Sequence, residues 1–398
     1  MFKKILGVTV ISLTIHNVFS ANYSDARNIA MGGVGVATSR GHGALLSNPA
    51  LLATEEKYQL TLPTVGIQLS DKHHLIDDLK SIKSKVDKYD ENRFNDVNAA
   101  KTLAGELASI LETIKNQNKA AYLNIGAAAS MIFPGPENTY RIGFLVKSQA
   151  DVAVHPTITE GDLRLASGIA SGNIPPINFE SNISSEARGL AVWMTDFGLS
   201  LARSFEIKDK RLQVGITPKM QMIKTFNYAV NINQYKTKDF KLNQYLSQHN
   251  KFNLDLGIAA ELTEQLTVGL VGKNLLKNNL ETKAIHDKSF TYQIAPVFST
   301  GAAYRWKQLT AALDVDITPT KAFSNQKDSQ YVGFGAEWEA SHWAKLRAGY
   351  RMDTKHSKPN IVTAGIGFHT GSVFKLDMAG MFSAKNNLGA VLQMSYTF

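Results

Sequence analysis

The sequence predicts an all-β fold, a 14-stranded antiparallel transmembrane β-barrel. Three observations predict it: fourteen segments read as strands, the connections between them alternate short and long, and the chain ends on Phe398 within the last such segment. Because lipid-facing and lumen-facing side chains alternate along each barrel strand, a hydrophobic content of only 44% is compatible with this fold. Beyond the N-terminus no run of about 18 apolar residues occurs, which excludes a bundle of membrane-spanning helices.

The first twenty residues have the pattern of a secretory signal peptide. Lys3 and Lys4 precede a short apolar stretch, and Val18 and Ser20 are small enough for positions −3 and −1 of a cleavage site. We therefore expect residues 1–20 to be removed between Ser20 and Ala21. The chain contains no Cys, which excludes disulfides, thiol redox chemistry, Cys-ligated metals and a lipoprotein anchor.

The net charge of +9 comes from 43 basic and 34 acidic residues, and its Lys-rich segments look like loops. Such loops can contact anionic lipopolysaccharide or nucleic acid. Solvated loop surface is the simpler interpretation, and no specific nucleic acid is expected.

Strand-like segments follow one another from residue 58 to the C-terminus, and segment 252–262 alternates cleanly between apolar and other residues. The fourteen predicted strands cover residues 58–70, 121–133, 140–152, 189–205, 211–228, 252–262, 266–273, 291–306, 309–318, 331–339, 344–352, 361–369, 374–383 and 389–398.

The connections fall into two classes of length. Those after even-numbered strands are short, with six, five, three and two residues at 134–139, 206–210, 263–265 and 307–308. Those after odd-numbered strands are long, at 71–120, 153–188, 229–251 and 274–290, although the sorting weakens after residue 320. Short periplasmic turns and long outer loops characterise outer-membrane barrels.

The long loop at 71–120 carries helical periodicity. Apolar residues lie at helical spacing from Leu75 to Val86 and again from Leu103 to Ile114. We expect two amphipathic helices on the outer rim. They could form a groove for a greasy ligand, dock on a partner, or pack on each other and cap the barrel mouth.

The last strand, 389–398, has one apolar face, formed by Phe398 and every second residue before it. We expect this face toward lipid, and we expect the strand to pair with strand 58–70 so that no edge remains. The terminal Phe398 resembles the assembly signal that the barrel-assembly machinery recognises in bacterial outer-membrane proteins. Other aromatic residues near strand ends, such as Tyr304, Trp306 and Trp338, fit an interfacial girdle.

The segment after the cleavage site carries two motifs, A-R-x-x-A-M-G-G-x-G-V-A and N-P-A-L-L-A. Their key residues are Gly32, Gly33, Gly35, Asn48 and Pro49. These motifs, together with L-R-A-G-Y-R-M-D, T-A-G-I-G-F and F-K-L-D-M-A near the C-terminus, resemble the conjugal-transfer TraF-type barrels within the FadL-like superfamily. The resemblance implies that residues 21–53 form an N-terminal hatch that plugs a barrel of residues 54–398. A phosphate-binding loop is a poor alternative, because no strand precedes the glycines and no Lys-Ser/Thr follows them.

Charged residues of mixed sign fall on the predicted inward face. An Arg or Lys in hydrocarbon would cost about 2–4 kcal/mol at the midplane, so we expect these side chains in the lumen. Holding the hatch is the main hypothesis for them, and conducting a solute is the alternative. The lumen-facing candidates are Asp255, Glu261, Asp314, Asp316, Glu337, Glu339, Lys345, Arg347 and Arg351.

The sequence predicts no enzyme. His73 and His74 are adjacent and point apart, so they make a poor metal site. His342, His369 and the Asp314–Asp316 pair belong to no recognisable catalytic motif, and a solvated lumen wall explains the aspartates equally well. No cofactor and no metal are expected.

Taken together, these patterns predict a bacterial outer-membrane β-barrel with an N-terminal hatch and helical extracellular loops. Its environment would be outer-membrane lipid and lipopolysaccharide, reached through the barrel-assembly machinery. The resemblance implies an accessory or structural component, associated with a secretion or conjugation complex. The alternative that its superfamily implies is a FadL-like passive channel for hydrophobic small molecules, with an apolar ligand.

Overall fold

The computed structural model of the chain describes residues 25–71, 73–92, 95–135, 140–173, 178–208, 210–234, 243–355, 359–371, 373–383 and 387–398. The predicted signal peptide, 1–20, and the first residues of the predicted hatch, 21–24, lie outside these ranges. Within them, no helix is both long and apolar enough to cross a bilayer.

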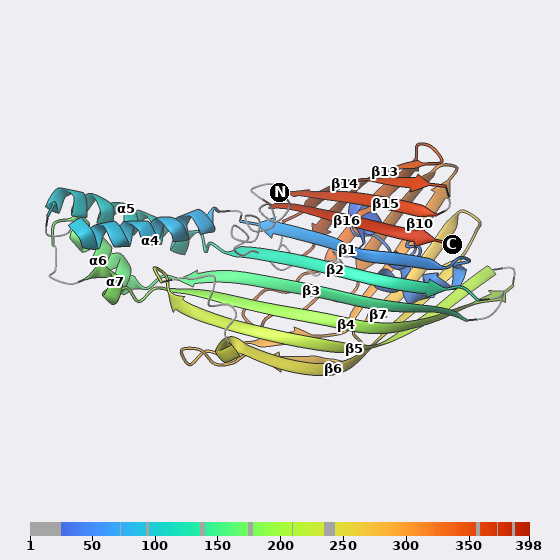
Figure 1. Cartoon of the computed structure of the whole chain (residues 1–398), viewed down its shortest axis with the longest axis horizontal. Helices are drawn as coiled ribbons and strands as arrows, with labels where there is room; N and C mark the ends of the chain where they lie inside the picture. The colour runs from blue at the N-terminus through green and yellow to red at the C-terminus, as the bar shows by residue number, and fades with distance from the viewer. Residues whose placement is uncertain are drawn as a thin grey trace, which may run out of the picture.

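Among the described residues, fourteen strands form one closed barrel in which all neighbours are antiparallel, as the alternation predicted (Figure 1). They are β1 (Gln59–Ser70), β2 (Ala121–Phe133), β3 (Arg141–Thr157), β4 (Glu186–Ile207), β5 (Lys210–Asn231), β6 (Leu246–Glu261), β7 (Leu266–Lys273), β10 (Val297–Trp306), β11 (Leu309–Asp316), β12 (Tyr331–Glu339), β13 (Ala344–Asp353), β14 (Ile361–Thr370), β15 (Phe374–Ser383) and β16 (Asn387–Thr397).

The barrel closes between its first and last strands, as predicted. β16 pairs with β1, with Gln59 opposite Thr397. Phe398 donates its backbone N–H to the carbonyl of Tyr58 over 3.0 Å, and the two rings stack with centroids 5.9 Å apart. The register of β1 shifts between Thr61 and Thr64, around Pro63, because proline has no N–H for the ladder.

Side chains alternate across the wall. On β4 the exposed outward residues run from Trp193 through Phe197 to Phe205, and on β16 they include Leu392 and Tyr396. At about 3.3 Å per residue and a tilt near 45°, thirteen residues from Trp193 to Phe205 span about 30 Å, close to a bilayer core. The remainder of β4 extends beyond this band, toward the end of the barrel that carries the helices.

One predicted strand was wrong. Residues 291–306 form two strands, because β9 (Thr291–Ile294) leaves the barrel and pairs instead with β8 (Asn278–Glu281) in a separate hairpin. The barrel strand β10 starts only after Pro296, whose missing N–H interrupts the ladder. The hairpin extends from residue 278 to 294 and is called the outer hairpin below.

Helices project from one end of the barrel, whereas the short turns and the C-terminus lie at the other end (Figure 1). Both helices expected in 71–120 are present, as α4 (Leu75–Asn92) and α5 (Val97–Asn116). Two further helices were not predicted, α6 (Glu160–Ala170) and α7 (Phe179–Asn182).

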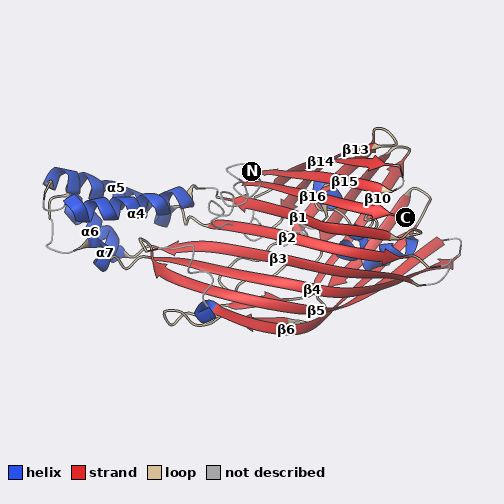
Figure 2. Ribbon diagram, viewed as in Figure 1, coloured by secondary structure: helices blue, strands red, loops and turns tan. Residues whose placement is uncertain are grey.

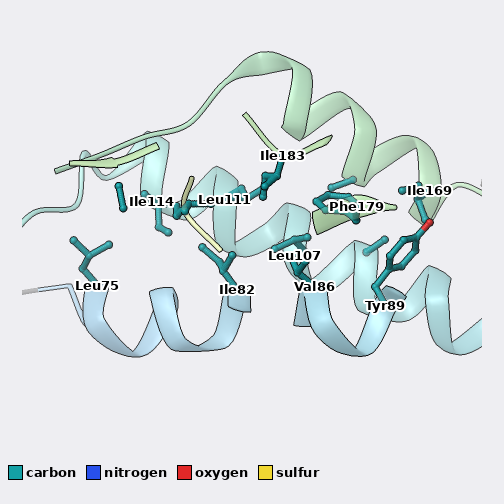
Figure 3. Close-up of a cluster of buried hydrophobic side chains, with 14 of the residues drawn as sticks. Leu75, Ile82, Val86, Tyr89, Leu107, Leu111, Ile114, Ile169, Phe179 and Ile183 are labelled. Carbon is teal, nitrogen blue, oxygen red and sulfur yellow. The ribbon is translucent and has the colours of Figure 1, made fainter. Parts of the chain in front are cut away.

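These four helices share one apolar core, in which α4, α5 and the α6–α7 segment direct side chains toward each other (Figure 3). The core contains Leu75, Ile82, Leu107, Leu111, Phe179 and Ile183. The apolar faces of the helices are therefore buried against one another, but the helices project away from the barrel (Figure 1) and do not cap its mouth, as one alternative considered from the sequence had it. A short 3₁₀ turn, η3 (Asn243–Tyr245), precedes β6 in the next loop.

The N-terminal segment lies inside the barrel, nearer the end with the short turns (Figure 2). It contains α2 (Ala26–Ala30), α3 (His42–Ser47) and the 3₁₀ helix η1 (Pro49–Thr54). α2 packs on β13–β16, and η1 packs on β3–β6 across the lumen. We call residues 25–54 the hatch.

Candidate functional site in the barrel lumen

The hatch lies against the wall through glycines on both sides. Gly32 has a φ of +76°, and a Cβ there would lie 2.6 Å from the carbonyl oxygen of Phe334. Opposite it, a Cβ on Gly335 would lie 2.2 Å from the carbonyl oxygen of Met31, and one on Gly349 would lie 2.2 Å from the nitrogen of Gly32. Backbone therefore touches backbone here, which side chains would prevent.

The second hatch motif makes a similar contact on the opposite wall. Asn48 caps η1 by accepting from the N–H of Ala50 over 3.1 Å, and Pro49 follows at the first helical position. The Nδ2 of Asn48 donates to the carbonyls of Val36, at 2.8 Å, and of Ile258 in β6, at 3.2 Å. One side chain thus ties two parts of the hatch to the wall.

A buried charge network holds the first helix of the hatch. The Nε and Nη2 of Arg27 donate to the two carboxylate oxygens of Glu337 over 2.9 and 3.0 Å. The Nε of Arg347 donates to the same carboxylate over 2.6 Å, and its Nη1 donates to Asp377 over 2.6 Å. The side chains of Arg347 and Glu337 are 1% and 6% exposed, so water contributes little to the stability of these charges. Removing one member would leave an uncompensated buried charge.

Asp314 holds the turn that follows. Its Oδ2 accepts from the backbone N–H groups of Gly35, at 2.6 Å, and Val36, at 2.9 Å. Two strands along the same wall, Lys273 in β7 donates to the carbonyl of Leu46 over 2.8 Å. Thr363 completes the set: its hydroxyl donates to the carbonyl of Ala30 and accepts from Gly32, each over 2.9 Å.

Five of the six remaining sequence candidates, all except Arg351, have hydrogen-bond or ion-pair partners in the wall. Asp255 accepts from Lys219 over 2.8 Å, and Glu261 accepts from Gln213 over 2.9 Å. Asp316 accepts from the hydroxyl of Ser299 and from the N–H of Tyr331. Glu339 and Lys345 pair with each other at the turn end. Of the nine candidates, the structure thus brings Asp314 and Glu337 into hydrogen bonds with the hatch, and Arg347 acts through Glu337.

Asp25 begins the hatch, and its carboxylate is 2% exposed. It accepts from the N–H of Asn28 over 2.7 Å and so caps α2. Burial raises the pKa of this carboxyl to about 6, although the N–H of Asn28 and the charge of Arg27 act in the opposite direction.

The outer hairpin packs against the inner face of the wall toward the other end of the lumen. Leu280, Tyr292 and Ile294 pack on Leu190 and Ile223, which point inward from the outer parts of β4 and β5. Phe323 joins this cluster, with its ring centroid 5.2 Å from that of Tyr292.

Polar contacts fix the base of the outer hairpin. The Nδ2 of Asn227 donates to the carbonyls of Lys283 and Lys288 over 2.8 and 2.9 Å. Arg188 reinforces Asn227 by donating to its Oδ1 over 2.7 Å.

Between the hatch and the outer hairpin lies a cavity of about 220 Å³. Its charged lining residues are Lys147, Lys219, Lys273, Lys321, Arg351, Asp196, Asp255, Asp314 and Asp316. Its apolar lining residues include Leu45, Leu145, Met194, Tyr292, Ile294 and Val297. The hatch and the outer hairpin therefore narrow the lumen on both sides of a partly open cavity of mixed polarity.

Sequence reasoning missed two features of this site. Arg27 was visible only as part of the glycine-rich motif, and nothing in a single sequence pairs it with Glu337, 310 positions away. The outer hairpin was missed because residues 274–290 lacked a clear strand pattern, although Pro296 was a signal that a strand breaks there. No group of three or more metal-ligating side chains occurs in the part of the chain that the structure describes.

Comparison with known proteins confirms the resemblance. The sequence profile of the family described as "F plasmid transfer operon, TraF, protein" matches residues 45–316. No curated protein sequence matches the chain.

Solved structures with this fold are FadL-like outer-membrane proteins. The toluene transporter TbuX of Ralstonia pickettii aligns with a TM-score of 0.58 and 13% identity, over 96% of this chain and 100% of TbuX. The toluene transporter TodX of Pseudomonas putida gives 0.56 and 14%, over 95% and 99%. A FadL homologue of Pseudomonas aeruginosa gives 0.52 and 10%, over 97% and 99%. At these identities the likeness establishes the fold alone.

Proposed function

The chain belongs to the family described as "F plasmid transfer operon, TraF, protein", and on this premise we propose that it is an accessory, structural component of the bacterial outer membrane rather than an open pore. The short turns would face the periplasm and the helices the cell exterior, as in other barrels of this class. Basic loops would then lie near lipopolysaccharide, and the barrel-assembly machinery would recognise the strand that ends at Phe398.

The observation that carries this proposal is the buried network of Arg27, Glu337, Arg347 and Asp377. A passive pore needs a path through its lumen, and this network fastens the hatch across it. The outer hairpin obstructs the same path from the other side. The loop helices bury their apolar faces in a core of their own, which suits a rigid projection for contacts outside the membrane.

Electrical recording in planar bilayers tests the proposal. The protein should first fractionate with outer membranes and show heat-modifiable migration, which establishes a folded barrel. We expect the purified chain to give no steady ion conductance. Glu337→Gln should produce transient openings because it loosens the hatch, whereas Glu339→Gln, on the same strand but paired at the turn end, should stay silent. A steady conductance from the unaltered chain would contradict a closed accessory barrel.

A second function is a passive channel for small hydrophobic molecules. The likeness to TbuX and TodX, both described as toluene transporters, favours it. Uptake of labelled toluene by cells with and without the chain separates the two functions. Equal uptake supports the accessory role, and uptake that depends on this chain supports the channel.

A further inference from the structure

We propose that the cavity between the hatch and the outer hairpin is a binding site for a small organic acid, with its carboxylate on Arg351 and its apolar body within the cavity. The proposal goes beyond the accessory role, since binding in the cavity requires no conduction.

Arg351 is a charged residue of the cavity whose buried N–H donors lack acceptors among the described residues. It points inward from β13, is 6% exposed, and lines the cavity. Its Nε and Nη2 are buried, and neither has a hydrogen-bond partner within the described part of the chain. A guanidinium cannot lose its charge in a protein. Burying its N–H donors without acceptors is therefore costly unless a bound molecule accepts their hydrogen bonds.

The unsatisfied edge is the one that recognises carboxylates. In Arg27 the same two atoms, Nε and Nη2, grip both oxygens of Glu337 over 2.9 and 3.0 Å. A ligand carboxylate would supply Arg351 with the same two acceptors in the same planar geometry. A neutral ligand with a single carbonyl oxygen fits less well, because one oxygen cannot accept good hydrogen bonds from both Nε and Nη2.

The neighbouring acids do not supply these acceptors. Asp316 accepts from Ser299 over 2.6 Å and from Tyr331 over 3.1 Å, and Asp314 holds the hatch through Gly35 and Val36. Asp255 is paired with Lys219 at 2.8 Å. With five cationic and four acidic side chains lining the cavity, an added carboxylate balances the charge of its walls.

Two contacts hold Arg351 in place for this role. Its guanidinium carbon lies 5.0 Å from the centroid of the Tyr331 ring, a cation–π arrangement. Its Cδ and Nη1 lie 3.5 Å from where a Cβ on Gly33 would be, so the hatch forms one wall of the site. The site is therefore incomplete without the hatch.

The apolar part of the lining sets the second requirement. Tyr292 and Ile294 come from the outer hairpin, and Met194 and Leu145 come from the barrel wall. At about 220 Å³ the cavity is smaller than the roughly 300–1,000 Å³ typical of drug-sized ligands. A one-ring acid satisfies both the charge and the size, whereas a hydrocarbon would leave Arg351 unsatisfied.

Equilibrium dialysis of the purified full-length chain in detergent tests the proposal with benzoate as the probe. Dialysis must continue until the bound fraction is constant, and empty micelles give the partition background. We expect saturable binding of about one benzoate per chain. Benzamide, which keeps the ring but not the charge, and acetate, which keeps the charge but not the ring, should each bind at least about tenfold more weakly.

Arg351→Gln should weaken benzoate binding roughly tenfold to a hundredfold, the change expected when hydrogen bonds to a charged group are lost. Arg351→Lys keeps the positive charge without the planar pair of N–H donors. Its benzoate affinity should therefore lie between those of the unaltered chain and Arg351→Gln. Arg305→Gln is the matched control, because Arg305 is exposed on β10 and does not line the cavity.

Equal binding of benzoate and benzamide would overturn the proposal, as would no saturable benzoate binding or full binding by Arg351→Gln. Should Arg351→Gln lose heat-modifiable migration, the comparison of benzoate with benzamide on the unaltered chain still decides. Bilayer conductance is measured separately, so a failure to bind benzoate leaves the accessory role untouched.

Discussion

The hatch and the helical projection are both held to the same barrel, but by different mixtures of contacts. The hatch packs apolar side chains such as Ile29 and Leu45 on the wall, and it is also fixed by hydrogen bonds, by ion pairs around Glu337, and by glycine contacts at Gly335 and Gly349. The projection is fixed by an apolar core that contains Leu107, Leu111 and Phe179 (Figure 3). Part of the difference follows from the barrel wall, whose outer face meets lipid and whose inner face offers charged as well as apolar side chains to anything that lies inside.

Breaking the charge network should have the largest effect, and it should affect the hatch alone. Glu337→Ala leaves Arg27 and Arg347 buried without their shared carboxylate, and we expect the hatch to lose about 3–5 kcal/mol. The chain has no Cys, so Ser39→Cys, 4% exposed in the hatch, gives a single thiol reporter. Labelling of this thiol should accelerate in Glu337→Ala and remain slow with Glu339→Ala. Slow labelling in both would show that the network does not hold the hatch.

A substitution in the apolar core of the projection should destabilise the projection and leave the hatch unchanged. Leu111→Ala, at a fully buried position of the projection, should cost about 2–5 kcal/mol and open the helices to protease. Thiol labelling of the hatch should not change. Glu112→Ala, the exposed neighbour, is expected to stay within about 0.5 kcal/mol of the unaltered chain. Faster hatch labelling in Leu111→Ala would mean that the two regions are coupled.

A glycine substitution sharpens the comparison at intermediate size. Gly335→Ala places a Cβ 2.2 Å from the carbonyl oxygen of Met31, and overpacking of this kind costs about 1–3 kcal/mol. Gly168→Ala in α6 meets nothing within 4 Å and should stabilise the projection by about 0.5–1 kcal/mol. The same Gly→Ala change is therefore expected to make thiol labelling of the hatch faster at position 335 and proteolysis of the projection slower at position 168. If Gly335→Ala leaves the labelling rate of the hatch thiol unchanged, the barrel wall can shift to accommodate the added methyl group.

A pH dependence of the hatch is also expected. The pKa of Asp25 is raised by burial from 3.8 to about 6, so this carboxyl favours the seated hatch below pH 4, and that contribution is lost as the pH rises to 6. Labelling of the hatch thiol, corrected for thiol ionisation, should become faster between pH 4 and pH 6. Asp25→Asn keeps an oxygen for the N–H of Asn28 but cannot ionise, so its labelling should lack this rise. A rise that persists in Asp25→Asn would assign the titration to another group.

Much of the barrel was predictable because alternation is a local property. Phe398, Tyr396 and Leu392 face outward as their period-two spacing predicted, and β16 closes on β1 because an unpaired edge is untenable in a bilayer. The helix at Leu75–Asn92 was visible for the same local reason. α6 and β8 were missed because short elements carry few periods and derive their stability from the surfaces on which they pack.

The sequence by itself determined which face of each strand meets lipid, how many strands close the wall, and that the wall's charges point inward. Only the tertiary structure decided which charges meet. Glu337 and Glu339 have the same chemistry and lie two residues apart on one face, yet one grips Arg27 and the other pairs with Lys345 at the turn end. The physical reason is that alternation assigns a side chain to a face but not to a depth. Its partner is set by where the hatch, which comes from the far end of the chain, lies within the lumen.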